Sequence, residues 1–136
     1  MLMTNIEADL PVGWTEKRND TRRDPTIVEY QHETADETRF IVSVTPQTAE
    51  EGYRLRLSTI NPTSTHVRHD YPVDEYDAID NAVEGGESFI DELSQRLQEG
   101  SISPVDPQFK SIRDTIQAFR GNRLVPLISR LLRRFT

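Results

Sequence analysis

The side chains best suited to chemistry are three histidines and one neighbouring aspartate. Imidazole nitrogens and carboxylate oxygens are ligands for zinc or iron, so the one conceivable metal set is His32, His66, His69 and Asp70. The spacing argues against a site, because His66 and His69 point to opposite faces if both lie on one strand. We therefore expect solvent-exposed or hydrogen-bonded histidines and no metal. Cysteine is absent, which excludes disulfides and every cysteine-based zinc site.

Paired acids recur along the chain and are the next candidates. They are Glu50–Glu51, Asp74 with Asp77, and Asp91–Glu92. General acid–base catalysis needs a carboxylate in a desolvated pocket facing a partner, whereas these acids fall in turns or on the polar side of a helix pattern. Gly85–Gly86 lacks the spacing of a phosphate-binding loop, and no serine has a nucleophile-elbow context. The pattern favours a non-enzymatic protein and indicates no cofactor.

The C-terminal segment has the pattern of a basic amphipathic helix. At 100° per residue its apolar side chains occupy an arc of about 160°, with arginines on the opposite side. A short helix of this kind is only marginally stable on its own in water, so we expect its apolar side to be buried against another surface. The candidate contact residues are Leu127, Leu131, Leu132 and Phe135 on the apolar side, and Arg123, Arg130, Arg133 and Arg134 on the basic side.

Three ways of burying that apolar side stay open. It packs on the chain's own domain or on a second copy, it docks on a separate protein, or it binds an anionic membrane surface or nucleic acid. The choice among these three depends on how strongly salt screens the attraction between the arginines and anionic surfaces. The amino-acid composition indicates the salt concentration to expect.

The basic residues are almost all arginines, since Lys17 and Lys110 are the only lysines among 16, against 23 acids and a net charge of −7. Such an acidic, lysine-poor, threonine-rich composition resembles that of proteins from extreme halophilic archaea. The resemblance covers the whole chain, rests on composition alone and carries no family motif. It implies near-molar salt, at which the Debye length is about 3 Å and attraction to phosphates is screened. We therefore expect a homo-oligomer or a protein partner bound through residues 106–135; a membrane surface is disfavoured, and nucleic acid is not expected.

Charge also divides the chain. Residues 1–100 carry 21 acids and 9 bases, a net of −12, whereas residues 101–136 carry 2 acids and 7 bases, a net of +5. We expect an acidic domain over 1–100 and a basic helical segment over 101–136, docked on the domain or on a partner. No apolar run approaches the ~20 residues of a membrane span, and the N-terminus lacks a signal-peptide pattern, so a cytoplasmic location is predicted.

Hydrophobic periodicity predicts an α+β fold. Period-two alternation, clearest at Tyr53, Leu55 and Leu57, indicates four or five strands in an antiparallel meander with one face wet. From Pro72 the period lengthens to that of a helix, so we expect the sheet to be covered by one helix over 73–99, long or broken at Gly85–Gly86.

A second helical unit follows Gly100. Asp106–Pro107 is typical of a helix start, and Gly121 of a stop, which together predict a C-terminal αα-hairpin over 106–135. The function we expect is a non-enzymatic interaction module or subunit that uses these helices. The alternatives are a small-molecule-binding or hydrolytic domain with its site between sheet and helix, and a binder of anionic surfaces acting through the arginines.

Overall fold

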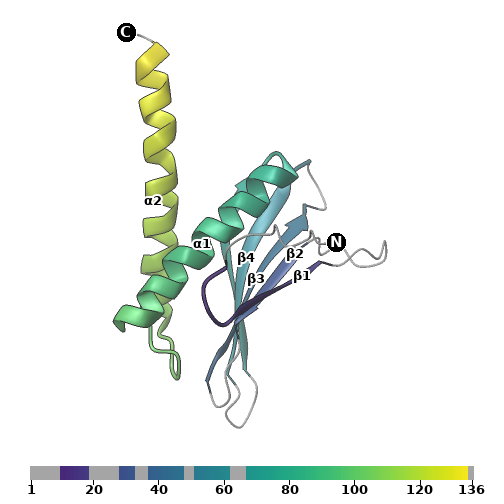
Figure 1. The fold of residues 1–136 in the computed structure, drawn as a ribbon, viewed down its shortest axis with the longest axis vertical. Coiled ribbons are helices and arrows are strands. Elements are labelled where there is room, and N and C mark those ends of the chain that lie inside the picture. The colour runs from purple at the N-terminus through teal and green to yellow at the C-terminus, as the bar shows by residue number, and fades with distance from the viewer. Residues whose placement is uncertain (1–9, 19–27, 33–36, 48–50, 62–66, 135–136) are drawn as a thin grey trace.

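The computed structural model describes residues 10–18, 28–32, 37–47, 51–61 and 67–134, with the side chains of these ranges except those of Arg18 and 122–134. Five strands precede two helices (Figure 1). The elements are β1 (Trp14–Arg18), β2 (Val28–His32), β3 (Arg39–Pro46), β4 (Tyr53–Ile60), β5 (Arg68–Tyr76), α1 (Ile79–Glu99) and α2 (Phe109–Arg134).

Each strand pairs antiparallel with the next one in the chain, in the order β1-β2-β3-β4-β5. This confirms the predicted α+β class and the meander. Alternation along the strands turns one set of apolar side chains toward the helices, where they are almost fully buried. This inner face carries Val28, Tyr30, Phe40, Val42, Val44, Leu55 and Leu57.

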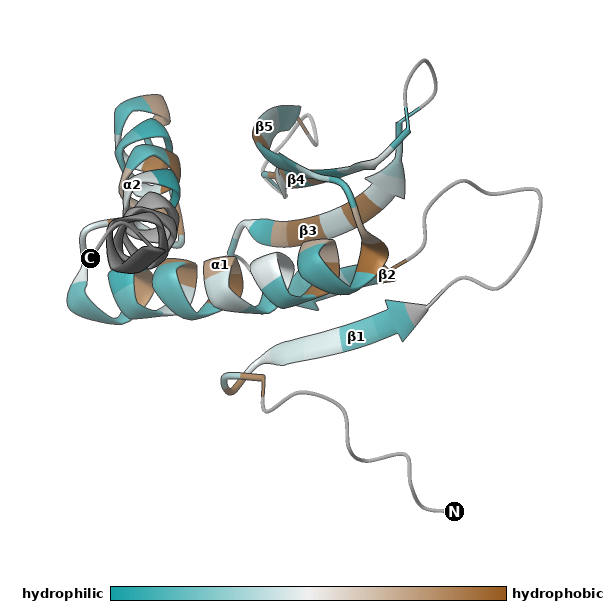
Figure 2. Cartoon of the chain, turned by 90° about the horizontal axis from the view of Figure 1, so that it is seen from above, coloured by the Kyte–Doolittle hydropathy of each residue, from teal (hydrophilic) through white to brown (hydrophobic). Residues whose placement is uncertain are grey.

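Both helices lie on the same side of the sheet, and α1 crosses its inner face (Figures 1 and 2). Phe89, Ile90 and Leu93 of α1 are fully buried against the strands. Trp14 is buried on the same side, and its Nε1 donates a hydrogen bond to Ser94 Oγ of α1 at 2.8 Å. The short edge strand β1 is thereby held to α1 as well as to β2.

The predicted start of the first helix was wrong by six residues. Strand β5 continues through Pro72 to Tyr76, and α1 begins only at Ile79. A β-bulge opposite Leu55 and Arg56 adds one residue to β5 and lets both Val73 and Tyr76 point into the core. Their three-residue spacing therefore resembles a helical period, although it comes from a bulged strand.

Gly85–Gly86 does not break α1, which continues through both glycines. Gly85 faces Tyr76 at the end of β5, and Gly86 faces Leu55 of β4. A Cβ on Gly85 would overlap the phenol ring of Tyr76, and one on Gly86 would lie 3.4 Å from Leu55. Gly85 thus allows the helix to pack closely on the ring of Tyr76, which offsets its cost of about 1 kcal/mol in helix propensity.

The predicted αα-hairpin over 106–135 is replaced by a single helix, α2, which starts at Phe109 and runs through Gly121 to Arg134. A glycine that ends a helix takes a left-handed conformation, as Gly100 does after α1 with a φ of 84°. Gly121 is not among the glycines with positive φ, so the backbone continues without a turn. Asp106 and Pro107 precede the helix rather than begin it.

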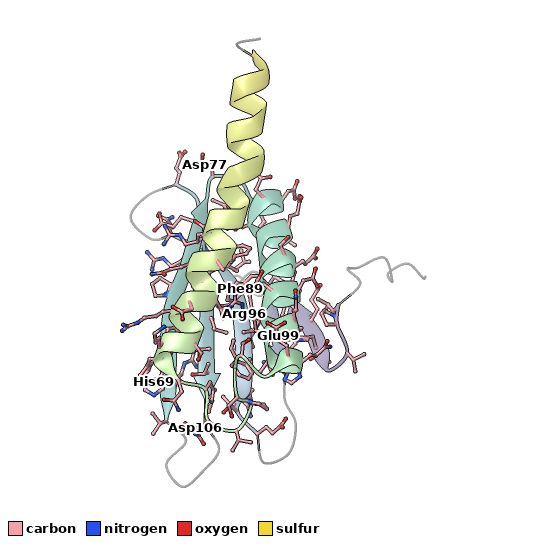
Figure 3. All side chains as sticks on the ribbon, turned by 90° about the vertical axis from the view of Figure 1, so that its left-hand side faces the viewer. His69, Asp77, Phe89, Arg96, Glu99 and Asp106 are labelled. Atoms are coloured by element: carbon pink, nitrogen blue, oxygen red, sulfur yellow. The ribbon has the colours of Figure 1, made fainter. Side chains whose placement is uncertain are left out.

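The first half of α2 belongs to the same core as α1 and the sheet. Ile112, Ile116 and Phe119 are buried, and the rings of Phe119 and Phe89 meet edge to face with centroids 5.2 Å apart. Ile102, in the connection between the helices, is also fully buried. The backbone of the second half of α2 extends past α1 and the sheet (Figures 1 and 3).

Candidate functional site

A hollow of about 300 Å³ opens at the end of the sheet where β4 and β5 meet the loop before α2. Its sheet side is built from Thr38, Thr59, Asn61, Val67 and His69, and its loop side from Asp106, Pro107, Gln108 and Phe109. His69 and Asp106 are both labelled near this end in Figure 3. Thr38 and Thr59 are buried, with 1% and 4% of their surface exposed. The hollow therefore has hydroxyl groups among its deepest side chains.

Hydrogen bonds brace the loop that forms one wall. The backbone N–H of Thr38 donates to the carbonyl of Pro104 at 2.8 Å. Ser103 Oγ accepts hydrogen bonds from two backbone N–H groups of the same loop, at Val105 and Asp106. Gln108 Nε2 donates to the Asp106 carboxylate at 3.0 Å. These contacts hold the loop in place beside the sheet.

Aromatic side chains flank the hollow. The rings of His69 and Phe109 meet edge to face with centroids 4.8 Å apart, and Tyr71 lies 6.2 Å from Phe109. Burial is the largest influence on Tyr71 and raises the pKa of its phenol, while Arg113 and a hydrogen bond with Thr59 oppose that shift. Phe109 remains half exposed, so one side of its ring is open to a ligand.

The described members of the conceivable metal set, His32, His69 and Asp70, do not lie together. His32 and His69 share one inner-face row but are separated by Phe40 and Thr59, which at the usual strand spacing is about 14 Å. Asp70, next to His69, points to the opposite face. His66 lies outside the described residues. Within the described ranges no three His, Asp or Glu side chains are placed to share a metal ion.

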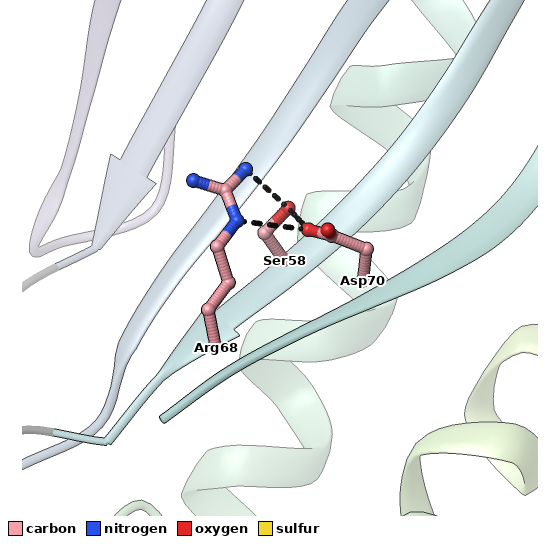
Figure 4. A network of polar contacts seen from close by, with 3 residues as sticks. All are labelled: Ser58, Arg68 and Asp70. Atoms are coloured by element: carbon pink, nitrogen blue, oxygen red, sulfur yellow. Dashed lines mark hydrogen bonds and ion pairs between the residues drawn. The ribbon is translucent and has the colours of Figure 1, made fainter. Parts of the chain in front are cut away.

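Asp70 instead joins a polar network on the open face of the sheet (Figure 4). Ser58 donates a hydrogen bond to its carboxylate, and Arg68 binds both Asp70, at 3.0 Å, and Ser58, at 3.2 Å. The bond from Ser58, followed by the contacts with Arg68, lowers the pKa of Asp70 below its usual value. Ser58 is fully buried, so this network ties β4 to β5 rather than presenting a nucleophile.

The predicted acidic pairs lie on the surface where the structure describes them. Asp77 and Asp91 are exposed, and Glu92 accepts a hydrogen bond from Arg96 one turn later at 2.8 Å. Glu50 lies outside the described residues. None of these described carboxylates faces the hollow.

The predicted contact residues of the C-terminal segment lie where the side chains are not described. Leu127, Leu131 and Leu132 fall in the second half of α2, and Phe135 follows its end. The same holds for Arg123, Arg130, Arg133 and Arg134. Phe135 lies outside the described residues, and for the others the structure places only the backbone, in the half of α2 that extends past α1 and the sheet (Figure 1).

The sequence analysis singled out only a few of the residues that line the hollow. His69 attracted notice as a metal candidate and Asp106 as a helix start. Thr38, Thr59 and Gln108 have ordinary polar side chains, and nothing in their spacing suggests that they meet. The sequence feature closest to such a signal is the interruption of the helical hydrophobic periodicity between the two helices. The loop that forms one wall of the hollow lies there.

Comparison of the chain with protein-family models, with curated proteins and with solved structures gives no match. Neither α1 nor α2, over the part of the chain that the structure describes, has the length and apolar content that a membrane-crossing helix requires.

Proposed function

We propose that this chain is a non-enzymatic interaction module that self-associates through the second half of α2. The observation that carries the proposal is the backbone of α2, which continues from the buried Phe119 to Arg134 and extends past α1 and the sheet (Figure 1). At 1.5 Å per residue this extension is about 22 Å long. It contains most of the segment for which the sequence predicts an apolar side.

An isolated extension of this length gains little from helix propensity alone. Helices of fewer than ~12–15 residues are marginal in water and owe most of their stability to packing of an apolar side. Leu127, Leu131 and Leu132 form that side in the sequence. Burial of these leucines against another chain accounts both for their apolar pattern and for the continuation of α2 past the rest of the fold.

Charge favours a second copy of this chain as the occupant. The segment 101–136 has a net charge of +5, whereas residues 1–100 have a net charge of −12. Helix α1 contributes six acids and one base, and Asp80, Glu84 and Asp91 on it are exposed. Two α2 extensions packed antiparallel would bury their leucines together and bring the arginines of each copy toward the acidic surface of the other.

Light scattering of the full chain after size-exclusion chromatography tests this, at about 0.2 M and about 2 M NaCl, where the Debye length falls from about 7 Å to below 3 Å. We expect a dimer at both concentrations, because leucine burial is not screened. The double variant Leu127→Gln/Leu131→Gln should weaken association about a hundredfold or more, since each leucine contributes about 1.5 kcal/mol or more.

The matched control is Arg130→Gln/Arg133→Gln, on the opposite side of the helix, which should leave the dimer intact at high salt. A monomeric full chain at both salt concentrations would contradict self-association. If the monomer then sediments with anionic vesicles or nucleic acid, and the arginine variant does not, the alternative of anionic-surface binding replaces it. Survival of the dimer at high salt is also what the predicted halophilic character requires.

A further inference from the structure

The hollow at the end of the sheet has the features of a binding site that is separate from the α2 extension. Of the four large apolar side chains that are exposed in the described part of the chain, two line it, Val67 and Phe109, at 43% and 51% exposure. A third, Val105, is 56% exposed and directly precedes Asp106 in the loop that forms one wall. Exposed apolar side chains gathered around a concave polar surface mark ligand contact more often than chance. The fourth, Val12, belongs to the turn before β1.

The side chains of the hollow determine its charge. Neither lysine nor arginine lines it, so an anion such as phosphate finds no fixed positive side chain there. Its one carboxylate, on Asp106, already accepts a hydrogen bond from Gln108. A cation would therefore find a single carboxylate in the lining, on Asp106, and would compete for it with Gln108. The lining suits an uncharged ligand best.

The hydrogen-bonding groups indicate which uncharged ligand. The hydroxyl of Thr38 donates a hydrogen bond to the carbonyl of Val105 at 3.5 Å, and the amide nitrogen of Gln108 donates to Asp106, so each of these side chains offers an oxygen as an acceptor. Thr59 and Asn61 add a hydroxyl and an amide to the lining. Hydroxyl groups on a ligand can donate to such acceptors.

Phe109 adds an apolar wall suited to the C–H face of a saturated ring. The other ring of the lining, on His69, meets Phe109 edge to face, so the two rings do not form a parallel pair between which a planar base could stack.

The hollow has room for one ring. At about 30 Å³ for each water displaced, 300 Å³ corresponds to roughly ten waters, or a ligand of roughly ten to twelve non-hydrogen atoms. We propose that the hollow lined by Thr59, Asn61, Gln108 and Phe109 binds a single sugar ring or a similar cyclic polyol. This is the small-molecule function, without hydrolysis, that the sequence left as an alternative, and it does not depend on self-association.

Titration of the full chain, followed by NMR chemical shifts, tests the proposal with D-glucose, D-galactose and D-mannose as probes. A ligand of this size at typical ligand efficiency binds with a Kd on the order of 1 mM, so titration to about 50 mM covers the range. We expect at least one sugar to shift resonances of the lining residues. Gln108→Ala and Phe109→Ala should each weaken it about three- to tenfold, the value of one lost contact.

Matched controls are Gln98→Ala, an exposed glutamine on α1, and Val12→Ala, an exposed apolar residue away from the hollow. Both should bind as the unmodified chain does. Absence of shifts at the hollow with all three sugars, or shifts there with inorganic phosphate or tetramethylammonium instead, would overturn the proposal. Because Gln108 is exposed, its variant decides the question even if Phe109→Ala fails to fold. Equal binding by Gln108→Ala and by Gln98→Ala would also refute it.

Discussion

His32 lies between two aromatic rings in the core-facing row of the sheet. Its ring centroid is 5.2 Å from that of Trp14 and 6.3 Å from that of Phe40. Nδ1 is buried and has no hydrogen-bond partner among the described residues. Burial lowers the pKa of the imidazole, and the nearby carboxylate of Glu37 only partly opposes this. The fold therefore tolerates neutral His32 better than its protonated form.

A pH dependence of stability follows from this environment. Because the folded-state pKa is lowered, the unfolded chain takes up the proton first, so stability is retained above the unfolded pKa of about 6.5 and lost as pH falls below it. Urea unfolding between pH 5 and 8 should show the loss. His32→Phe, which keeps a ring between Trp14 and Phe40, should reduce the loss over this window. An identical pH dependence in the variant would contradict this origin.

Two adjacent glycines of α1 should respond oppositely to the same substitution. Gly85→Ala should destabilise the fold by about 1–3 kcal/mol, because the new methyl group overlaps the ring of Tyr76. Gly86→Ala meets Leu55 and Tyr30 only at 3.4 and 3.6 Å, so it should be neutral or stabilising by up to about 1 kcal/mol. Chemical denaturation of both variants makes the comparison, and a larger loss in Gly86→Ala would show that the helix approaches the sheet differently.

At the scale of the element, the continuity of α2 through Gly121 is the feature with the clearest consequence. Nothing lies within 4 Å of a Cβ placed at Gly121, so alanine there meets no obstacle. Gly121→Ala should stabilise the helix by about 1 kcal/mol through propensity. If a turn of the predicted hairpin lay there instead, the same change would be destabilising.

Gly100→Ala provides the matched comparison in the same chain. Gly100 ends α1 in a left-handed conformation, with open space where the methyl group would be. Alanine there should destabilise by about 1 kcal/mol, for conformational rather than packing reasons. Thermal unfolding monitored by circular dichroism should move the two melting temperatures in opposite directions.

At the scale of the whole molecule, the core extends past the charge boundary at residue 100. Ile102, Ile112, Ile116 and Phe119 complete it, and Phe119 covers Phe89 of α1. Ending the chain at Gly100 should therefore abolish cooperative unfolding, because losing even one buried isoleucine or phenylalanine costs about 2–5 kcal/mol.

Ending the chain after Gly121 keeps all four of these side chains and should preserve a cooperative transition. Urea unfolding of the two shortened chains, compared with the full chain, measures this. A stable, cooperative 1–100 fragment would show that the division expected from charge is also a division of the fold. Dimerisation should disappear in the longer fragment, since it lacks the second half of α2.

The sequence by itself determined the α+β class and an antiparallel meander of four or five strands. The alternation of Tyr53, Leu55 and Leu57 shows why: in-and-out periodicity is local, and short connections leave antiparallel neighbours as the simple pairing. The stop at Gly100 was also predictable, since a helix-ending glycine acts through its own backbone.

Only the tertiary structure decided where β5 ends, that Gly85–Gly86 and Gly121 lie inside helices, and that a hollow exists. Each of these depends on groups far apart in the chain. The bulge at Val73 is defined by its partner strand, Gly85 by the ring of Tyr76, and the hollow by a loop that hydrogen bonds bring beside Thr38. Local periodicity contains no information about such contacts, because packing between distant segments overrides the preference of each.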